Sequence, residues 1–137
     1  MSARYDETVM SRPDETWSVR VVHEPQSASD DERRVVASEV ELAGSAFARA
    51  RGLMFRRSVP DDYALVFHFD EQATRRLHMI FVPFDIDAVW VADGVVQQTE
   101  RLSAGTGRDR AVADTVIELP AEAAADVQTG DRVWIDD

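Results

Sequence analysis

The stretch RRLHMIFVPFDIDAVWVADG, residues 75–94, decides the fold class. In a strand, residues two apart share a face, and beyond Asp87 both faces of the segment 86–92 are apolar. Such a segment predicts a strand that is covered on both sides. Asp93-Gly94 follows it directly and is a hairpin signal that leads into a second strand over residues 95–102. The stretch therefore predicts a β-rich domain that contains this hairpin.

Further strands are predicted outward from this stretch, where apolar residues alternate or run in short blocks between turns, over 17–23, 35–42, 63–69, 76–81, 111–119 and 132–135. Two short helices are also predicted. The first begins at the N-cap residue Ser45 and carries one apolar face, made of Phe47, Ala50, Leu53 and Met54. The second covers residues 120–126 and begins with a proline. We expect a mainly β domain with minor α (α+β), a compact β-sandwich or barrel with the first helix packed against it and the second near the C-terminus.

The length of 137 residues is that of one domain. Residues 1–16 are polar and without periodicity, which predicts a disordered acidic tail before a single β-rich domain over residues 17–137. No apolar run is long enough to span a bilayer, and the N-terminus lacks the apolar centre of a secretory signal. We therefore expect a soluble, cytoplasmic protein without a membrane partner.

The charge balance is strongly acidic. There are 26 acidic residues against 15 basic ones, all of them arginine, and the formal net charge is −11. Such a surface disfavours nucleic acid, because non-specific binding depends on neutralising phosphates. It is typical of salt-accumulating cells, and a salt-adapted origin is predicted, with arginine use in a GC-rich genome as the alternative. The absence of cysteine excludes disulfides, thiolate zinc sites and thiol nucleophiles.

Seven short motifs along the chain, taken together and in this order, resemble the family called domain of unknown function 192. They are GLMFR (52–56), LVFHF (65–69), HM (78–79), ID (86–87), DGVV (93–96), IELPA (117–121) and GDRV (130–133). The resemblance covers roughly residues 35–135. It implies a compact β-sandwich-like domain with one short helix lying against it, and it implies no activity, because the family carries no agreed function.

The central stretch departs from the family pattern, which often reads Trp-Met-Lys-Asn-Thr followed by Pro-Leu-Asp. Met79 and Asp87 match, and His78 stands where the family has Trp or, in one branch, His. Ile80 and Phe81 replace the Lys and Asn, and Asp85 replaces the Pro. These departures weaken any proposal that a polar Lys-Asn pair does chemistry here.

His78 and Asp87 are the residues of the quoted stretch whose types can bind a metal or move protons. A divalent metal needs about three convergent ligands, and Glu118 or Glu41 is a candidate for the third. No HExxH or comparable spacing requires such a site. The alternative is a structural cluster in which Asp87 pairs with an arginine of segment 49–57 or caps a turn, and His78 hydrogen-bonds a carbonyl. We favour the structural interpretation and predict no metal and no cofactor.

Arginines around the first predicted helix, Arg51 and Arg56 in particular, are suited to bind a carboxylate or phosphate, or to pair with the acidic surface. The loop GTGRDR (105–110) lacks the third glycine and the following helix of a nucleotide-binding loop. No serine nucleophile motif is present in the sequence.

The sequence therefore predicts a non-enzymatic, monomeric module that binds a small ligand or a protein partner. Its proposed site lies between GLMFR and the HM and ID strands, with five candidate residues, Arg51, Arg56, His78, Asp87 and Glu118. Two alternatives remain open. One is a metal-assisted hydrolase that uses His78, Asp87 and Glu118, and the other is a purely structural or interaction domain.

Overall fold

The structure is a computed structural model and describes residues 19–26, 32–43 and 52–136. This part of the chain is mainly β, with eight strands and no α-helix. The strands are β1 (Arg20–Glu24), β2 (Arg34–Ala37), β3 (Glu39–Leu42), β4 (Tyr63–His78), β5 (Ile86–Ala92), β6 (Val95–Leu102), β7 (Arg108–Pro120) and β8 (Arg132–Asp136). The mainly β prediction is confirmed.

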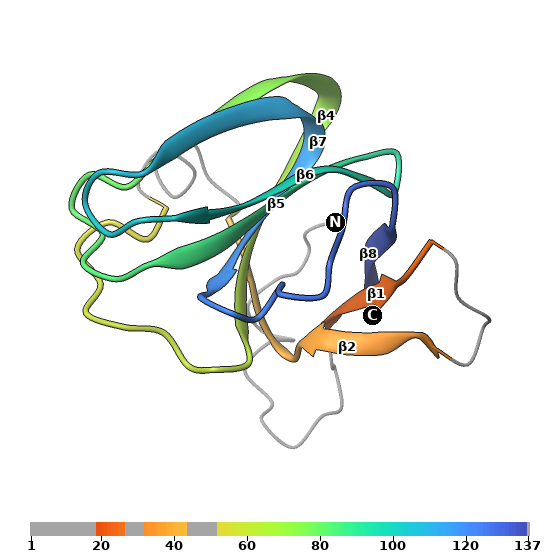
Figure 1. The fold of residues 1–137 in the computed structure, drawn as a ribbon, viewed down its shortest axis with the longest axis horizontal. Helices are drawn as coiled ribbons and strands as arrows, with labels where there is room; N and C mark the ends of the chain where they lie inside the picture. Colours follow the sequence, from red (N-terminus) through yellow and green to blue (C-terminus); the bar gives the residue numbers. More distant parts are fainter. Residues whose placement is uncertain (1–18, 27–31, 44–51, 137) are drawn as a thin grey trace, which may run out of the picture.

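All eight strands belong to one open sheet in the order β2-β1-β8-β6-β5-β7-β4-β3 (Figure 1). Neighbouring strands are antiparallel except β3 and β4, which pair in parallel. The link between β6 and β8 is short, with a single register pair, Val95 and Arg132. The sheet therefore has a wide central part, β6-β5-β7-β4, and a smaller part, β2-β1-β8, attached through β8.

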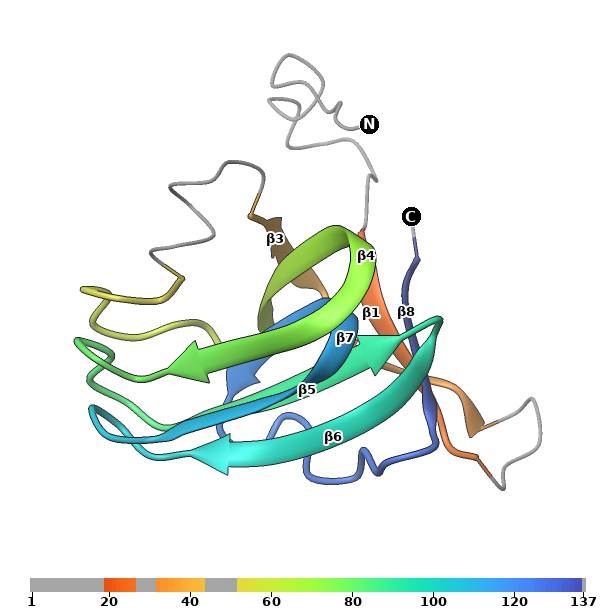
Figure 2. The same cartoon turned by 90° about the horizontal axis from the view of Figure 1, so that it is seen from above.

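The long strands β4 and β7 run side by side and curve strongly (Figure 2). Their register is interrupted between His68 and Ala73, so the ladder has two regular halves with an irregular segment between them. Such irregularities bend a sheet and increase its twist. The halves predicted as separate strands, 63–69 and 76–81, are thus one strand that ends at His78, not at Phe81.

The sheet buries one apolar cluster on each face, as expected for residues that alternate sides along a strand. The front core contains Ala43, Leu53, Tyr63, Leu65, Phe67, Met79, Val82, Ile86, Ala88, Trp90, Leu102, Ala113 and Val116. The back core contains Val21, Ala37, Ala64, Val66, Val89, Val91, Val96, Ile117, Leu119, Ala124, Val127 and Val133. The smaller part of the sheet therefore packs against the back of the central strands, an arrangement like that of a sandwich.

The hairpin predicted from the quoted stretch is confirmed. β5 and β6 have the predicted bounds, and every residue of β5 is buried. Asp93 and Gly94 both have positive φ, 54° and 80°, which matches the right-handed twist of paired strands in a two-residue turn. Asp93 N–H is held by Asp114 Oδ2 at 2.9 Å.

Both helix predictions need correction. Residues 44–51, which include Ser45, Phe47 and Ala50, lie outside the described residues, and residues 52–55, with Leu53 and Met54, form a turn. Residues 121–126 also form turns. Glu122 has φ 81°, which no α-helix accommodates, and Ala124 N–H bonds the Asp87 carboxylate instead of a helical carbonyl. A tertiary contact outweighs the helical tendency of the alanine-rich segment.

The strand predicted over 35–42 is divided at Ser38, whose N–H and hydroxyl bond the backbone oxygen and the carboxylate of Asp62. β2 and β3 consequently pair with different partners, β1 and β4. The tail predicted for residues 1–16 lies outside the described residues. Within the described ranges, no helix exists that could cross a membrane.

Candidate functional site

Glu118 lies on the front face of β7. It is paired across the sheet with Ala88 of β5 and Leu65 of β4, both members of the front core. The side chain is 5% exposed and borders a cavity of about 200 Å³. The cavity is lined by Gly52, Leu53, Met54, Phe67, Arg76, Leu77, His78, Met79, Val82, Ile86 and Glu118. Since Arg76 and His78 are exposed, the cavity reaches the surface on their side.

The described residues do not supply all the hydrogen bonds that the buried Glu118 carboxyl can accept. Its Oε1 atom is buried and has no hydrogen-bond partner within the described part of the chain. Burial raises the pKa of Glu118 to about 7 from an ordinary 4.5, and the charge of Arg56 lowers it by a smaller amount. An unpaired buried carboxyl is costly, so its presence beside a cavity is a feature of functional sites.

The turn at residues 52–55 forms one wall of the cavity, and its backbone explains why glycine is present. Gly52 has φ +54°, and a Cβ placed there would lie 3.7 Å from both Glu118 Oε1 and Phe67 Cζ. A side chain at this position would therefore be strained and would fill part of the cavity. The GLMFR motif begins with this residue and continues into the wall with Leu53 and Met54.

The opposite wall is joined to this turn by a pair of aromatic residues. Phe55 N–H donates to Phe81 O at 2.8 Å, and the two rings stack with centroids 5.0 Å apart. Both residues have positive φ, 70° and 63°, and both side chains are exposed, by 65% and 62%. Bulky residues rarely adopt this conformation, and it persists only where the surroundings enforce it. The contact fixes the spacing of the two loops that border the cavity.

His78 is exposed at the end of β4 and lines the same cavity as Glu118. Its Nδ1 accepts a hydrogen bond of 3.3 Å from Ile80 N–H. The predicted hydrogen bond to a carbonyl is therefore replaced by one from a backbone donor, which requires Nδ1 to be unprotonated in this arrangement. Of the predicted site residues that the structure describes, His78 and Glu118 are the two that share a cavity.

Arg56 belongs to a separate group of polar residues with Glu41 and Tyr63. It donates to Tyr63 Oη and to Glu41 Oε1, each at 3.0 Å, while Tyr63 Oη donates to Glu41 Oε1 at 2.6 Å. Burial and the Glu41 carboxylate raise the pKa of Tyr63 well above its ordinary value. Glu41 is thus a partner of Arg56 and Tyr63. Arg51 lies outside the described residues.

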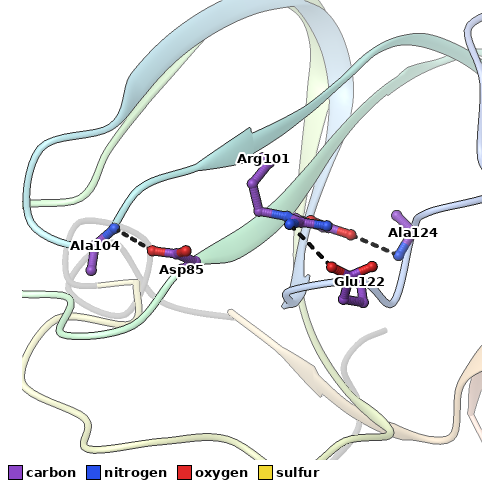
Figure 3. A network of polar contacts seen from close by, with 6 residues as sticks. Asp85, Arg101, Ala104, Glu122 and Ala124 are labelled. Atoms are coloured by element: carbon purple, nitrogen blue, oxygen red, sulfur yellow. Dashed lines mark hydrogen bonds and ion pairs between the residues drawn. The ribbon is translucent and has the colours of Figure 1, made fainter.

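Asp87 lies on the back face, because its register partners are Leu119 of the back core and Arg101 of β6. It is 5% exposed, it pairs with Arg101, and its Oδ2 accepts the Ala124 N–H at 2.9 Å. Arg101 also reaches Glu122 (Figure 3). The prediction that Asp87 caps a turn is confirmed. Its arginine partner is Arg101, and no described residue of segment 49–57 takes that role.

The three residues of the hydrolase alternative do not converge, because Asp87 and Glu118 occupy opposite faces of the sheet. A single metal ion cannot bind both across a backbone ladder. Within the described ranges, no three His, Asp or Glu side chains are grouped so as to hold a metal ion. Asp85, also considered from sequence, is exposed, and its Oδ1 accepts the Ala104 N–H at 2.8 Å.

Sequence reasoning missed a buried pair on the back side, His23 with Asp131. His23 Nε2 lies 2.8 Å from Asp131 Oδ2, and Asp131 also accepts the backbone N–H groups of Gln26 and Gln128. The two residues are 108 positions apart, so no local pattern joins them. The only signal was a histidine in an alternating strand and an aspartate in GDRV.

The family model for DUF192, described as Uncharacterized ACR, COG1430, matches residues 26–135. No curated protein matches the chain. Two solved structures share the fold. One, from Sinorhizobium meliloti 1021, is described as a proposed transcription regulator; its TM-score is 0.70, its identity 23%, and the match covers 86% of this chain and 94% of that one.

The other is a protein of unknown function from Novosphingobium aromaticivorans DSM 12444. Its TM-score is 0.69 and its identity 22%, and the match covers 85% of this chain and 84% of that one. Sequence identities this low show a shared fold but not a shared function. The predicted salt-adapted origin receives no support from these comparisons.

Proposed function

This chain belongs to the DUF192 family, and we propose that it is a binding module for a small organic molecule held in the Glu118 cavity. The observation that carries the proposal is the buried Glu118 Oε1, which has no partner among the described residues and borders the cavity. A ligand that donates a hydrogen bond there would satisfy an atom that the described residues leave without a partner.

The size of the cavity limits the ligand. About 200 Å³ is smaller than the pockets that hold drug-sized molecules, which begin at roughly 300 Å³. It exceeds an apolar cavity of about 150 Å³ that is known to admit benzene. A single six-membered ring with one substituent therefore fits, and a nucleotide does not.

The chemistry of the lining defines the ligand class. Most of the wall is apolar, with Leu53, Phe67, Met79, Val82 and Ile86 among the residues that surround Glu118. The carboxyl accepts a hydrogen bond when ionised, and an ammonium or hydroxyl group is suited to that role. The proposed ligand has a compact apolar body and one donor group.

The test uses three probes of one shape, cyclohexylamine, cyclohexanol and cyclohexanecarboxylate, in a titration observed by methyl NMR. Met54 and Met79 line the cavity and supply methyl signals in its wall. We expect saturable shifts of both signals with the amine and the alcohol, with a Kd of about 1 mM, typical of fragments this small. At about pH 8, above the pKa of Glu118, the carboxylate is expected to be excluded because it would lie against an ionised Glu118.

Glu118→Gln is the decisive variant, since it keeps the shape and removes the charged acceptor. We expect it to weaken the amine at least tenfold, whereas the matched control Glu122→Gln, on an exposed glutamate, leaves the affinity unchanged. Equal binding by all three probes, or no saturable shift up to about 10 mM, would contradict the proposal and favour a purely structural or interaction domain.

A further inference from the structure

A cluster of positive charge lies where β4 ends and β7 begins, beside the Glu118 cavity. The ladder there is regular, and it places Arg76 directly opposite Arg110 and His78 directly opposite Arg108. Directly opposed residues share a face and have Cβ atoms about 5 Å apart. Leu77, between Arg76 and His78, and Ala111, next to Arg110, pack on the front core, so these four residues point to the other side, and all four are exposed.

Like charges directly opposite each other destabilise a sheet. Arg76, Arg108 and Arg110 form no ion pair with a carboxylate in the part of the chain that the structure describes, although the sequence holds 26 acidic residues. Other arginines, such as Arg56 and Arg101, do find carboxylate partners. A cluster of arginines without a carboxylate partner among the described residues, in a chain of net charge −11, is therefore not explained by surface pairing.

A cavity of about 490 Å³ lies at this cluster, lined by Arg76, Leu77, His78, Arg108, Asp109 and Arg110. From this cavity and the unpaired arginines we infer that the ends of β4 and β7 form an anion-binding site for a small molecule that carries a phosphate or pyrophosphate group. Guanidinium groups match phosphate oxygens in geometry and bind them through two parallel hydrogen bonds. Such an anion would also relieve the repulsion between the opposed arginines.

The charge of the rest of the protein favours a small anion over a nucleic acid. At physiological salt, charges more than about 8 Å apart are largely screened, so the acidic surface does not prevent a small anion from binding. A nucleic acid would extend past the cluster, and its further phosphates would meet an acidic protein. The site is therefore matched to one or two phosphate groups.

The site adjoins the Glu118 cavity but differs from it in chemistry. Arg76, Leu77 and His78 line both cavities, so this end of β4 is a wall between them. The Glu118 carboxyl repels an anion, whereas the arginines attract one. Anion binding is therefore expected to persist in Glu118→Gln, and the outcome at either site does not decide the other.

The experiment is a titration with inorganic pyrophosphate at constant ionic strength, followed by calorimetry and by the melting temperature of the full chain. We expect binding that weakens at least tenfold in Arg76→Gln and in Arg110→Gln. The matched control is Arg132→Gln, on an exposed arginine of β8 without an ion pair among the described residues, and it should bind like the unaltered protein. Arg110→Gln alone should also melt at a higher temperature than the unaltered protein when no anion is present.

Retention of part of the affinity in Arg110→Lys, which keeps the charge but loses the paired donors, would support the guanidinium role. Equal pyrophosphate affinity in all variants would overturn the inference, as would no binding by the unaltered protein. Binding of duplex DNA that pyrophosphate does not displace would also overturn it, in favour of a nucleic-acid surface.

Discussion

Buried carboxyl groups on the two sides of the central sheet differ in their hydrogen-bond partners. On the back side, Asp87 and Asp131 are each held by a cationic or imidazole partner and by backbone N–H groups. On the front, Glu118 is equally buried, but its Oε1 lacks a partner among the described residues. The satisfied carboxylates join distant segments of the chain, and the unsatisfied one borders a cavity. Burial alone therefore does not distinguish a structural carboxylate from a candidate binding group, whereas hydrogen-bond accounting does.

The largest expected effect is on the back side. Asp131→Ala leaves His23 Nε2 and the N–H groups of Gln26 and Gln128 without their acceptor. Breaking a buried pair of this kind should lower the free energy of unfolding by about 4 kcal/mol, measured by urea denaturation. The matched control Asp126→Ala removes an exposed aspartate and should cost under about 0.5 kcal/mol. Similar losses of unfolding free energy in both variants would contradict the structural role assigned to Asp131.

The second effect, about 3 kcal/mol, is a pH dependence from Glu118. Its folded-state pKa of about 7 exceeds the ordinary 4.5, so between these values the folded chain holds a proton that the unfolded chain has released. Stability should therefore fall as pH rises from about 4.5 to 7 and level off above that range. Glu118→Gln should abolish the fall, and Glu100→Gln, on an exposed glutamate, should keep it. A flat profile in the unaltered protein would contradict the assigned pKa.

Asp131 contributes with the opposite sign in a lower pH range. Burial alone would raise its pKa, but the hydrogen bonds from His23, Gln128 and Gln26 lower it below the ordinary 3.8. Its stabilisation is present above that value and is lost as pH falls through the lowered pKa. Together the two contributions predict maximal stability at about pH 4 to 5. In Asp131→Asn, the part of the acid-induced loss of stability that comes from protonation of Asp131 should be absent. Acid unfolding followed by circular dichroism measures this difference.

A smaller loss of stability is expected when Asp87, the other hydrogen-bonded carboxylate of the back side, loses its arginine partner. Arg101→Ala removes the cation from Asp87 but leaves the Ala124 N–H and the solvent near the exposed Arg101 position. We expect a loss of about 1 kcal/mol in urea denaturation. A loss as large as that of Asp131→Ala would mean that Arg101, and not the backbone cap, holds Asp87 in the folded state.

The smallest expected effect concerns neither face but the acidic surface as a whole. At about 1 M KCl the Debye length is roughly 3 Å, so repulsion within a chain of net charge −11 is largely screened. If the composition reflects a salty cell interior, the melting temperature should rise by a few degrees between low salt and molar KCl. A melting temperature that does not change over this range would contradict the salt-adapted interpretation.

The parts of the fold that local pattern determines could be predicted from sequence. β5, β6 and their Asp93-Gly94 turn follow from strand alternation and turn chemistry alone. The helix over 120–126 could not be excluded in this way, because the competing bond of Ala124 to Asp87 joins residues 37 positions apart. The continuity of β4 could not be predicted either, because its polar centre resembles a loop in the sequence. Only the pairing with β7 before and after that centre makes it one strand.

The candidate site was only partly predictable for the same reason. The motifs GLMFR, HM and ID do border one cavity, and Glu118 belongs to it. Asp87 does not, because strand parity within β5 is readable from sequence but its register against β7 is not. The arginines without an ion pair among the described residues are further examples. Arg76 and Arg110 lie on separate strands, and nothing local indicates that the sheet places them opposite each other.

The order of strands in the sheet has a consequence for biosynthesis. β1 and β2 reach the remainder of the sheet through β8, and Arg20 pairs with Asp136 at the other end of the described chain. During translation β1 and β2 are made before β8, the strand that pairs with β1 on its other edge. They must remain unpaired on that edge while β3 to β7 assemble, and unpaired edges are prone to association with other chains. A nascent chain arrested before residue 132 should therefore hold an aggregation-prone N-terminal segment, and release of the last strand should be the step that removes it.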